Sequence, residues 1–320
     1  MEKKIIIVGA GLVGSLWAVY MRKAGYKVVI YERRSDIRKA EISAGKSINL
    51  ALSERGWNSL KTAGIKEDIE KIAIPMSGRV MHSEEGKLTY QAYGKKDEAI
   101  YSVSRGHLNA IMMDLAEKKG NSEIHYQHQC IDADLKNGKI TLKNLKTNEI
   151  FEDQADVVFA ADGAYSAIRY NSMQKVDRFN FSQFYVEDGY KELLLPAGPM
   201  GEYQIEKNAL HIWPRGRFML IALPNEDGSF TCTLFMPYEN HKYAFNDLDN
   251  DEKIDAFFKT VFPDFYNLMP NLIDNWHQNP LSSMSITRCY PWTIGKFALL
   301  GDSAHSTVPF YGQGMNAGFE

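Results

Sequence analysis

The 320-residue sequence contains few cysteines, and their arrangement suits neither a disulfide framework nor a zinc site. There are only three, Cys130, Cys232 and Cys289, and none belongs to a Cys-x-x-Cys pair. An odd number of widely spaced cysteines is typical of proteins from a reducing compartment. We therefore expect a cytoplasmic protein without structural disulfides.

The sequence also lacks an excess of charge of either sign. Lys and Arg number 37 and Asp and Glu 40, which gives a formal net charge of -3. Without a basic excess, broad binding to nucleic-acid phosphates is disfavoured. The 44% hydrophobic and 24% charged residues exclude a disordered chain, a collagen-like fibre and a coiled coil. The length suggests about two globular domains.

Long hydrophobic runs are absent as well, apart from one uncharged stretch near the start. Residues 5–21 carry no charge and follow Lys3 and Lys4, as in a signal peptide or a short membrane helix. Three glycines interrupt the stretch, and no small-residue cleavage site follows it. We interpret it as a strand, a turn and a helix, and we expect no membrane anchor in this chain.

This stretch begins a strand–helix–strand unit. The β-branched run Ile5–Val8 is typical of a buried parallel strand, residues 12–24 have helical character, and Lys27–Tyr31 forms a second apolar run. Such a unit at the N-terminus predicts a parallel sheet with helical crossovers.

The turn of this unit carries a dinucleotide-binding motif, Gly9-Ala-Gly11-Leu-Val-Gly14. The first glycine permits the tight turn, the second lets the backbone approach a pyrophosphate, and the third lets the helix pack close to the strand. Glu32, eighteen residues beyond Gly14, ends the next strand, near the usual position of a ribose-binding carboxylate. The motif alone does not separate NAD from FAD.

Later segments repeat this α/β texture around an insertion of a different kind. Apolar strands are expected at 124–135, 139–145, 156–161 and 295–300, whereas short aromatic-rich runs from 179 to 237 indicate an antiparallel sheet. Residues 79–83 and 87–93 indicate a hairpin, and 251–262 an amphipathic helix. We expect an α/β FAD-binding domain of residues 1–74, 98–175 and 281–320, and a substrate domain of residues 75–97 and 176–280.

Two further motifs follow buried strands. The first is Asp162-Gly163, and the second is Gly301-Asp302 followed by Gly312-Gln-Gly314. Ligands gather at the carboxyl ends of parallel strands, where the Asp302 carboxylate can accept hydrogen bonds from a polyol. Each motif by itself is equally compatible with an ordinary capped turn between a strand and a helix.

In this order, the three motifs resemble those of the class A flavoprotein monooxygenases, the single-component aromatic hydroxylases of the para-hydroxybenzoate hydroxylase type. The resemblance implies a discontinuous Rossmann-like FAD-binding domain with an inserted, mostly antiparallel substrate domain. It also implies FAD as cofactor and NADPH as co-substrate. The sequence has no second Gly-x-Gly-x-x-Gly motif, and the family has no separate NADPH domain.

Three segments are similar to one branch of this family, the branch that hydroxylates L-kynurenine. They are SGRVMHSEEGKLTYQAYG, IYSVSRGHLN and GDSAHSTVPFYGQGMNAGFE, and the similarity runs along most of the chain. The resemblance implies 3-hydroxylation of L-kynurenine with O2 through a flavin C4a-hydroperoxide, a step of tryptophan catabolism and NAD biosynthesis.

The resemblance also implies roles for individual residues. Arg79 would pair with the substrate carboxylate through its planar guanidinium, and Tyr93 would donate its hydroxyl to the same group. Phe310 and Tyr311 would line the catalytic pocket beside the flavin. Cofactor contacts would come from Gly9, Gly11, Val13, Gly14, Glu32, Arg33, Ala51, Arg105, Asp162, Asp302, Gly314, Met315 and Asn316. No metal ligands are expected.

Alternatives remain at this point. The chain ends at Glu320, within the helix that should follow the last motif, whereas family members continue with further substrate contacts. We therefore expect a chain that lacks this C-terminal region, which would be a flavin-binding fragment without turnover if those contacts are essential. Another class A hydroxylase is a second alternative. A dehydrogenase with one Rossmann domain is a third, but it leaves the two later motifs unexplained.

Overall fold

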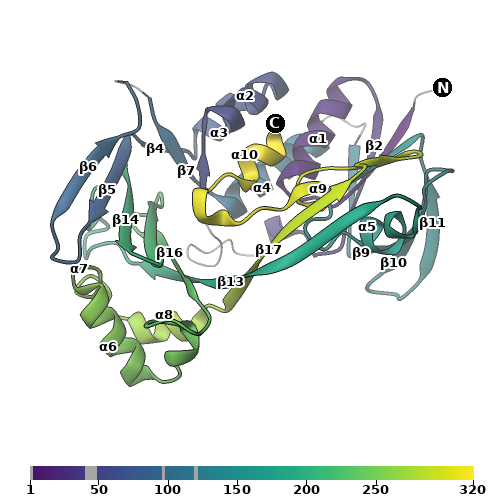
Figure 1. The fold of residues 1–320 in the computed structure, drawn as a ribbon. Coiled ribbons are helices and arrows are strands. Elements are labelled where there is room, and N and C mark those ends of the chain that lie inside the picture. Colours follow the sequence, from purple (N-terminus) through teal and green to yellow (C-terminus); the bar gives the residue numbers. More distant parts are fainter. Residues whose placement is uncertain (1–2, 40–48, 96–97, 119–121) are drawn as a thin grey trace.

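The computed structural model describes residues 3–39, 49–95, 98–118 and 122–320 (Figure 1). A mostly parallel sheet of six strands, in the order β18-β19-β12-β1-β2-β8, forms the base of the first domain. Its strands are β1 (Lys4–Val8), β2 (Lys27–Glu32), β8 (Ser122–Tyr126), β12 (Val157–Ala160), β18 (Thr293–Ile294) and β19 (Phe297–Leu299).

Both faces of this sheet are covered, which explains the uninterrupted apolar run of β1. Ile5 and Ile7 belong to a core shared with helices α1 (Leu12–Lys23), α2 (Glu54–Ala63) and α4 (Arg105–Glu117). Ile6 and Val8 pack instead against a three-stranded sheet of β9 (His128–Asp134), β10 (Lys139–Asn144) and β11 (Ile150–Gln154). A parallel strand buried on both faces needs apolar residues at every position. The predicted strand–helix–strand unit is confirmed.

The expected single strand at 124–135 is wrong, because the chain leaves one sheet for another within it. Gln127 has a φ of +60°, a left-handed conformation that ends β8 after its pairing with β2. The chain continues as β9, which pairs with β10 in the three-stranded sheet. The apolar alternation runs through the bend, so the periodicity did not reveal it.

The second domain is built on a seven-stranded sheet, β17-β13-β16-β15-β14-β5-β6. These strands are β5 (Gly78–His82), β6 (Leu88–Ala92), β13 (Asn180–Leu195), β14 (Ala209–Arg215), β15 (Phe218–Pro224), β16 (Phe230–Pro237) and β17 (Leu281–Tyr290). The predicted β5–β6 hairpin is confirmed. Strand β5 pairs in parallel with β14, which attaches the hairpin to the insertion.

Helices cover only one face of this sheet. α6 (Asp251–Val261), α7 (Pro263–Tyr266) and α8 (Leu272–Gln278) enclose a core that includes Trp213, Phe258 and Phe262. The long strands β13 and β17 run from this domain across to the first one (Figure 1). Strand β17, at 281–290, therefore pairs within the substrate sheet, although its residues fall in the segment expected to belong to the FAD-binding domain.

A small three-stranded sheet, β3-β7-β4, is separate from the two larger sheets. It consists of β3 (Asn49–Leu52), β4 (Ile74–Met76) and β7 (Ile100–Ser104). The Asn49 amide donates to Ser102 Oγ at 3.1 Å, to Pro224 O at 3.0 Å and to Asn225 Oδ1 at 2.7 Å, which ties this sheet to the end of β15. The remaining helices are α3 (Lys66–Glu70), α5 (Ala167–Asn171), α9 (Asp302–His305) and α10 (Gly314–Phe319). Within the described ranges, no helix is long and apolar enough to cross a membrane.

Candidate functional site

The glycine motif forms a turn that is closely packed at two positions and open at the third. Gly9 has a φ of +103°, and a Cβ there would lie 2.5 Å from the carbonyl oxygen of Ala161 on the neighbouring strand. A Cβ on Gly14 would collide with the Gly9 carbonyl, but a Cβ on Gly11 would meet nothing within 4 Å. Gly9 and Gly14 thus shape the turn, whereas Gly11 leaves its backbone accessible to a ligand phosphate at the start of α1.

Glu32 lies next to this turn, as the spacing predicted. Its Oε2 accepts a hydrogen bond from Ala10 N at 2.8 Å, and its Oε1 accepts bonds from Arg34 N and Nε. Burial raises the pKa of Glu32, but the Arg34 and Ala10 bonds outweigh burial and keep it below its usual value. Glu32 is therefore an ionised acceptor beside the glycine turn. Arg33 is exposed, and Arg34 is the residue that contacts Glu32.

The two aspartate–glycine motifs meet in space. Ser303, next to Asp302, donates from its hydroxyl to Asp162 Oδ1 at 3.0 Å and accepts from Gly163 N at 2.9 Å. The other Asp162 oxygen accepts from Ala167 N at 2.8 Å. Both oxygens of Asp162 are thus held by the protein, so this residue shapes the loop. Gly163, with a φ of +86° and open space where a Cβ would lie, is the accessible part of the motif.

The charge of Arg105 acts on the carboxyl group of Asp302. Asp302 is open to solvent on one side, yet the surrounding protein desolvates it and raises its pKa, while the Arg105 charge lowers it. The same Arg105 charge acts on Glu192 of β13, whose pKa burial raises. Arg105 is the first residue of α4 and, among the described residues, forms no ion pair within 4 Å. The charge of Arg105 thus lowers the pKa of two carboxyl groups, those of Asp302 and Glu192.

The C-terminal segment is fastened to β3 by one buried amide. Asn316 Nδ2 donates to Ala51 O at 2.9 Å and to Gly312 O at 3.1 Å, and its Oδ1 accepts from Ser53 N at 3.0 Å. Asn316 is fully buried, so its side chain positions the loop before α10. Met315 is buried and Gly314 partly so, while Val13 packs where a Cβ on Gly301 would lie.

The face of the seven-stranded sheet opposite to α6–α8 carries the predicted substrate residues. Burial alternates along β5, with Gly78, Val80 and His82 buried and Arg79 exposed. Arg79 Nε donates to Gln91 Oε1 at 2.8 Å on the adjacent strand. Tyr93 lies two residues beyond Gln91, the partner of Arg79, and its N donates to Ser77 O at 3.1 Å, so register places Tyr93 on the same face, diagonal to Arg79. Burial raises the pKa of Tyr93, and the Arg79 charge lowers it.

Strand register extends this face from Arg79 on β5 across the sheet to β13. Cross-strand partners lie on the same side of a sheet, and the pairing links Arg79 in one row to Leu210, Leu223 and Thr231. The next row contains Met81, Ile212, Ile221, Thr233 and Glu192. The face is therefore apolar in its centre, with a cation at one edge and a carboxyl group at the far side.

Phe310 closes the far end of this face. Its ring centroid lies 5.2 Å from that of Phe235 on β16, which shares a row with Met219 and Tyr190. Tyr311 is 85% exposed, so in this conformation it packs against little of the protein. The structure thus brings Phe310 together with the sheet, and it leaves Tyr311 outside that contact.

Sequence reasoning missed Glu192 and Thr233. Thr233 is 1% exposed, and its hydroxyl has no hydrogen-bond partner in the described part of the chain. The sequence does contain a signal for them. Glu192 in β13 and Thr233 in β16 alternate with apolar residues that pack in the core beneath the helices. Only the register, however, assigns these two residues to the face opposite to α6–α8.

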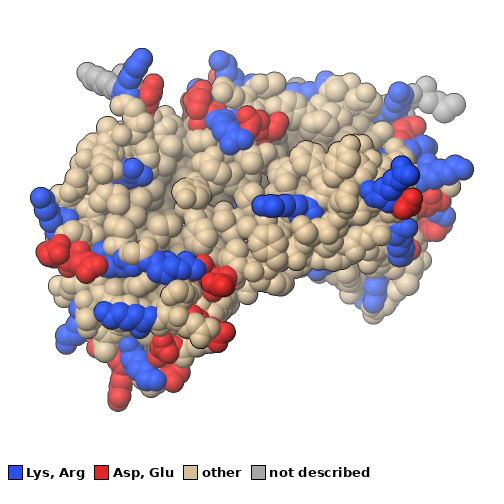
Figure 2. Space-filling view, in the orientation of Figure 1, with Lys and Arg blue, Asp and Glu red and all other residues tan. Residues whose placement is uncertain are grey.

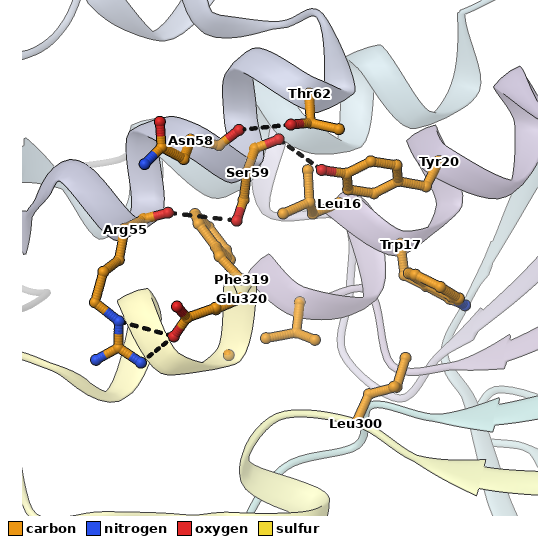
Figure 3. Close-up of a pocket in the computed structure, with 12 residues that line it drawn as sticks. Leu16, Trp17, Tyr20, Arg55, Asn58, Ser59, Thr62, Leu300, Phe319 and Glu320 are labelled. Atoms are coloured by element: carbon orange, nitrogen blue, oxygen red, sulfur yellow. Dashed lines mark hydrogen bonds and ion pairs between the residues drawn. The ribbon is translucent and has the colours of Figure 1, made fainter.

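Two other cavities lie away from this face. One, of about 420 Å³, is lined by residues of α1, α2 and α10, with Arg55 paired to Glu320 at its rim (Figure 3). A second, of about 410 Å³, lies near Arg215 and Lys242. Charged side chains gather at the periphery of the face shown in Figure 2, and its middle is largely uncharged.

Comparison with known proteins identifies the family of this chain. Residues 2–320 match the family model described as FAD binding domain. The structure resembles 2-methyl-3-hydroxypyridine-5-carboxylic acid oxygenase, with a TM-score of 0.79 at 20% identity over 100% of this chain and 80% of that one. It also resembles p-nitrophenol 4-monooxygenase from Pseudomonas putida, with a TM-score of 0.74 at 17% identity over 100% and 77%. The chain is a member of the FAD-dependent monooxygenases and has the predicted hydroxylase fold.

Closer relatives narrow this class. The chain is 49% identical to kynurenine 3-monooxygenase of Flavobacterium psychrophilum over all 320 residues, which span 70% of that protein. It is 47% identical to kynurenine 3-monooxygenase of Dictyostelium discoideum, over 100% of this chain and 68% of that protein. The chain belongs to the kynurenine 3-monooxygenase family.

Proposed function

We propose that this protein hydroxylates L-kynurenine at ring carbon 3, with NADPH and O2 as co-substrates. The balance is one oxygen atom inserted into a C–H bond, the second released in water, and NADPH oxidised to NADP+. The observation that carries the proposal is the face of the seven-stranded sheet opposite to α6–α8, where Arg79 and Tyr93 precede an apolar surface that ends at Phe310.

This face suits an aromatic amino acid. Arg79 keeps its terminal guanidinium nitrogens free of the Gln91 bond and can bind a carboxylate with them, while Tyr93 donates a hydroxyl. The ring would lie over Ile212 and Ile221, toward Phe310. The aniline nitrogen of the substrate activates its own ring, so these residues need only orient the ring and exclude water.

The fit of FAD rests on two open backbones and two carboxylates. Gly11 and Gly163 leave space where side chains would block a pyrophosphate, Glu32 is an ionised acceptor near the first, and Asp302 is available to a ribitol chain. When bound, FAD supplies the chemistry of electron transfer from NADPH and oxygen activation. Val13, Ala51, Arg105, Gly314, Met315 and Asn316 complete the proposed cofactor site, together with Gly9 and Gly14. The proposed contact of Arg33 with the cofactor is supported only by its position next to Glu32 in the sequence.

We propose a two-domain division that differs from the expected one only in residues 281–290, which form β17 and pair within the seven-stranded sheet. Residues 1–74, 98–175 and 291–320 would bind FAD, and residues 75–97 and 176–290 would bind substrate. A cytoplasmic location is supported by the three free cysteines, two of which are buried.

The test is NADPH oxidation by the FAD-loaded chain, with and without L-kynurenine. Stimulated oxidation with formation of 3-hydroxykynurenine is the expected result. Stimulated oxidation that yields only hydrogen peroxide would preserve substrate binding but contradict productive hydroxylation. Failure to bind FAD, or oxidation indifferent to kynurenine, would overturn the proposal.

A further inference from the structure

A chain of buried hydrogen bonds lies beneath the substrate hairpin, on the face of the sheet opposite to Arg79. Asp264 Oδ2, from α7, lies 2.8 Å from His82 Nδ1 on β5. His82 Nε2 lies 2.9 Å from His211 Nδ1 on β14, and His211 Nε2 lies 2.8 Å from the carbonyl oxygen of Glu206. Both imidazoles are at least 96% buried.

This geometry fixes the number of protons in the chain. A carbonyl oxygen only accepts, so His211 must donate from Nε2. Burial lowers the pKa of His211 to about 4, so near neutral pH this ring is uncharged and presents an unprotonated Nδ1 to His82. His82 must then donate from Nε2 and also, to the Asp264 carboxylate, from Nδ1. The hydrogen-bond network thus assigns His82 a second proton and a positive charge.

The groups around the chain favour this ion pair. Trp213 donates from Nε1 to the same Asp264 oxygen at 2.8 Å, and its ring stacks on His82 with centroids 3.9 Å apart. Burial raises the pKa of Asp264, but the bonds from His82 and Trp213 outweigh it and hold that pKa below its usual value. The other charged group against His82 is Arg215 of β14, which donates to the His82 carbonyl at 3.0 Å. Glu84 and Glu85 of the hairpin turn act on Arg215 in turn.

The chain is placed where it can control Arg79. All five residues of β6 are exposed, so the hairpin depends on β5 for its attachment. β5 is held by four parallel pairs with β14 and, at its end, by His82, three residues beyond Arg79. The side chain of His82 is fastened by Asp264 and His211, and its backbone by Arg215.

We propose that His82, with Asp264 and His211, is a positioning group that fixes the hairpin and thereby the substrate-binding geometry of Arg79 and Tyr93. This inference rests on the proposed function of Arg79. Removal of one partner leaves the other buried polar groups of the chain without their hydrogen bonds, and the hairpin loosens. Affinity for the substrate therefore falls when the chain is interrupted, while FAD binding stays the same.

The experiment compares wild type with His82→Gln, with both chains loaded with FAD. Dissociation constants for L-kynurenine are measured by flavin absorbance, both at the same pH. His82→Gln should bind L-kynurenine about tenfold more weakly than wild type, equivalent to about 1.4 kcal/mol. Its affinity for FAD should equal that of wild type.

Further variants separate the possible failures. Asp264→Asn should weaken L-kynurenine binding in the same way, whereas His277→Gln, which removes an exposed His–Asp pair, should match wild type. Unchanged FAD affinity and an unchanged circular dichroism spectrum show that each variant is folded. Weaker binding in Arg79→Gln with wild-type kynurenine affinity in His82→Gln would overturn this inference and leave the proposed function intact. No effect in Arg79→Gln would overturn the proposed function itself.

Discussion

Arg79 is the single residue on which substrate recognition depends most directly. It is an exposed residue of β5, next to the edge strand β6, and among the described residues its side chain bonds only to the neutral Gln91, so its charge is available to a ligand. A charge-assisted bond to a carboxylate is about twice as strong as a neutral one. Exposed ion pairs elsewhere in the chain, such as Lys66–Glu70 and Lys253–Asp249, contribute little by comparison.

Replacing Arg79 with Gln should weaken L-kynurenine binding by about 1.5–3 kcal/mol, roughly 10- to 150-fold, because a charged hydrogen bond is lost. The measurement is a titration followed by flavin absorbance. FAD affinity should remain at the wild-type value. Arg178→Gln removes a guanidinium that is 93% exposed and serves as the control. Equal kynurenine affinity in Arg79→Gln and Arg178→Gln would contradict the assignment.

Glu192 is the residue that the structure adds to the site, and its carboxyl group is held partly away from water. Burial raises its pKa, against the charge of Arg105. A carboxyl group with a raised pKa destabilises the folded state where it must ionise. The penalty is therefore absent well below the ordinary Glu pKa of about 4.3 and develops as pH rises through the raised folded value.

Glu192→Gln should accordingly gain thermal stability over wild type near pH 8 and lose this advantage near pH 3.5. Thermal unfolding of the FAD-free chain at several pH values measures it. The exposed Glu85→Gln has no such burial and should show no comparable gain. A constant difference between Glu192→Gln and wild type at all pH values would show that ionisation of this carboxyl group is not the cause.

At the scale of elements, the site depends on turns that follow parallel strands. Gly11 follows β1 and Gly163 follows β12, and these two strands are neighbours in one sheet. At both glycines an added Cβ would face open space. Gly9 and Gly14 are different, because a side chain there would strike backbone. The same motif thus contains positions that maintain the turn and a position that leaves room for a ligand.

Gly11→Val should therefore abolish tight FAD binding, by at least roughly 100-fold or about 2.7 kcal/mol, while it changes the stability of the FAD-free chain by only about 0.5 kcal/mol. Flavin fluorescence quenching and urea unfolding measure the two effects. Gly14→Val makes the contrast, since its side chain would collide with the Gly9 carbonyl and should unfold the chain. Retained FAD affinity in Gly11→Val would place the pyrophosphate elsewhere.

At the scale of the whole molecule, the cofactor site is assembled from distant parts of the chain. Asn316 bonds to Ala51 and Ser53, and Ser303 bonds to Asp162 and Gly163, so ligand binding there should couple the N-terminal and C-terminal segments. A ligand that binds only the folded state stabilises all of these contacts together.

Free FAD at 100 times its dissociation constant should raise the free energy of unfolding by about 2.7 kcal/mol. Urea unfolding with and without FAD, followed by the intrinsic fluorescence of tryptophan, provides the measurement. In Gly11→Val, with its affinity at least roughly 100-fold weaker, the same FAD concentration should add no more than about 0.4 kcal/mol. Equal stabilisation of both chains would mean that FAD acts away from the glycine turn.

Local patterns were sufficient for the strand–helix–strand unit, the glycine turn and the proximity of Glu32. These features depend on residues close in sequence, where apolar runs, a Gly turn and a terminal acid leave few other conformations. The helix at 251–262 and the β5–β6 hairpin were predictable for the same reason. The motifs also indicated the family, because their order along the chain is itself informative.

Tertiary structure alone decided which groups meet. The parallel pairing of β5 with β14 joins Gly78 to Ala209, and this long-range register creates the face shared by Arg79, Ile212 and Glu192. The hydrogen bond from Ser303 to Asp162 and the His82–Asp264 pair likewise join segments that are far apart in the sequence. Neither segment has a sequence feature that identifies its partner. The turn at Gln127 was equally hidden in the apolar pattern. Local preferences fix what each segment becomes, whereas the packing of one segment on another fixes which side chains share a site.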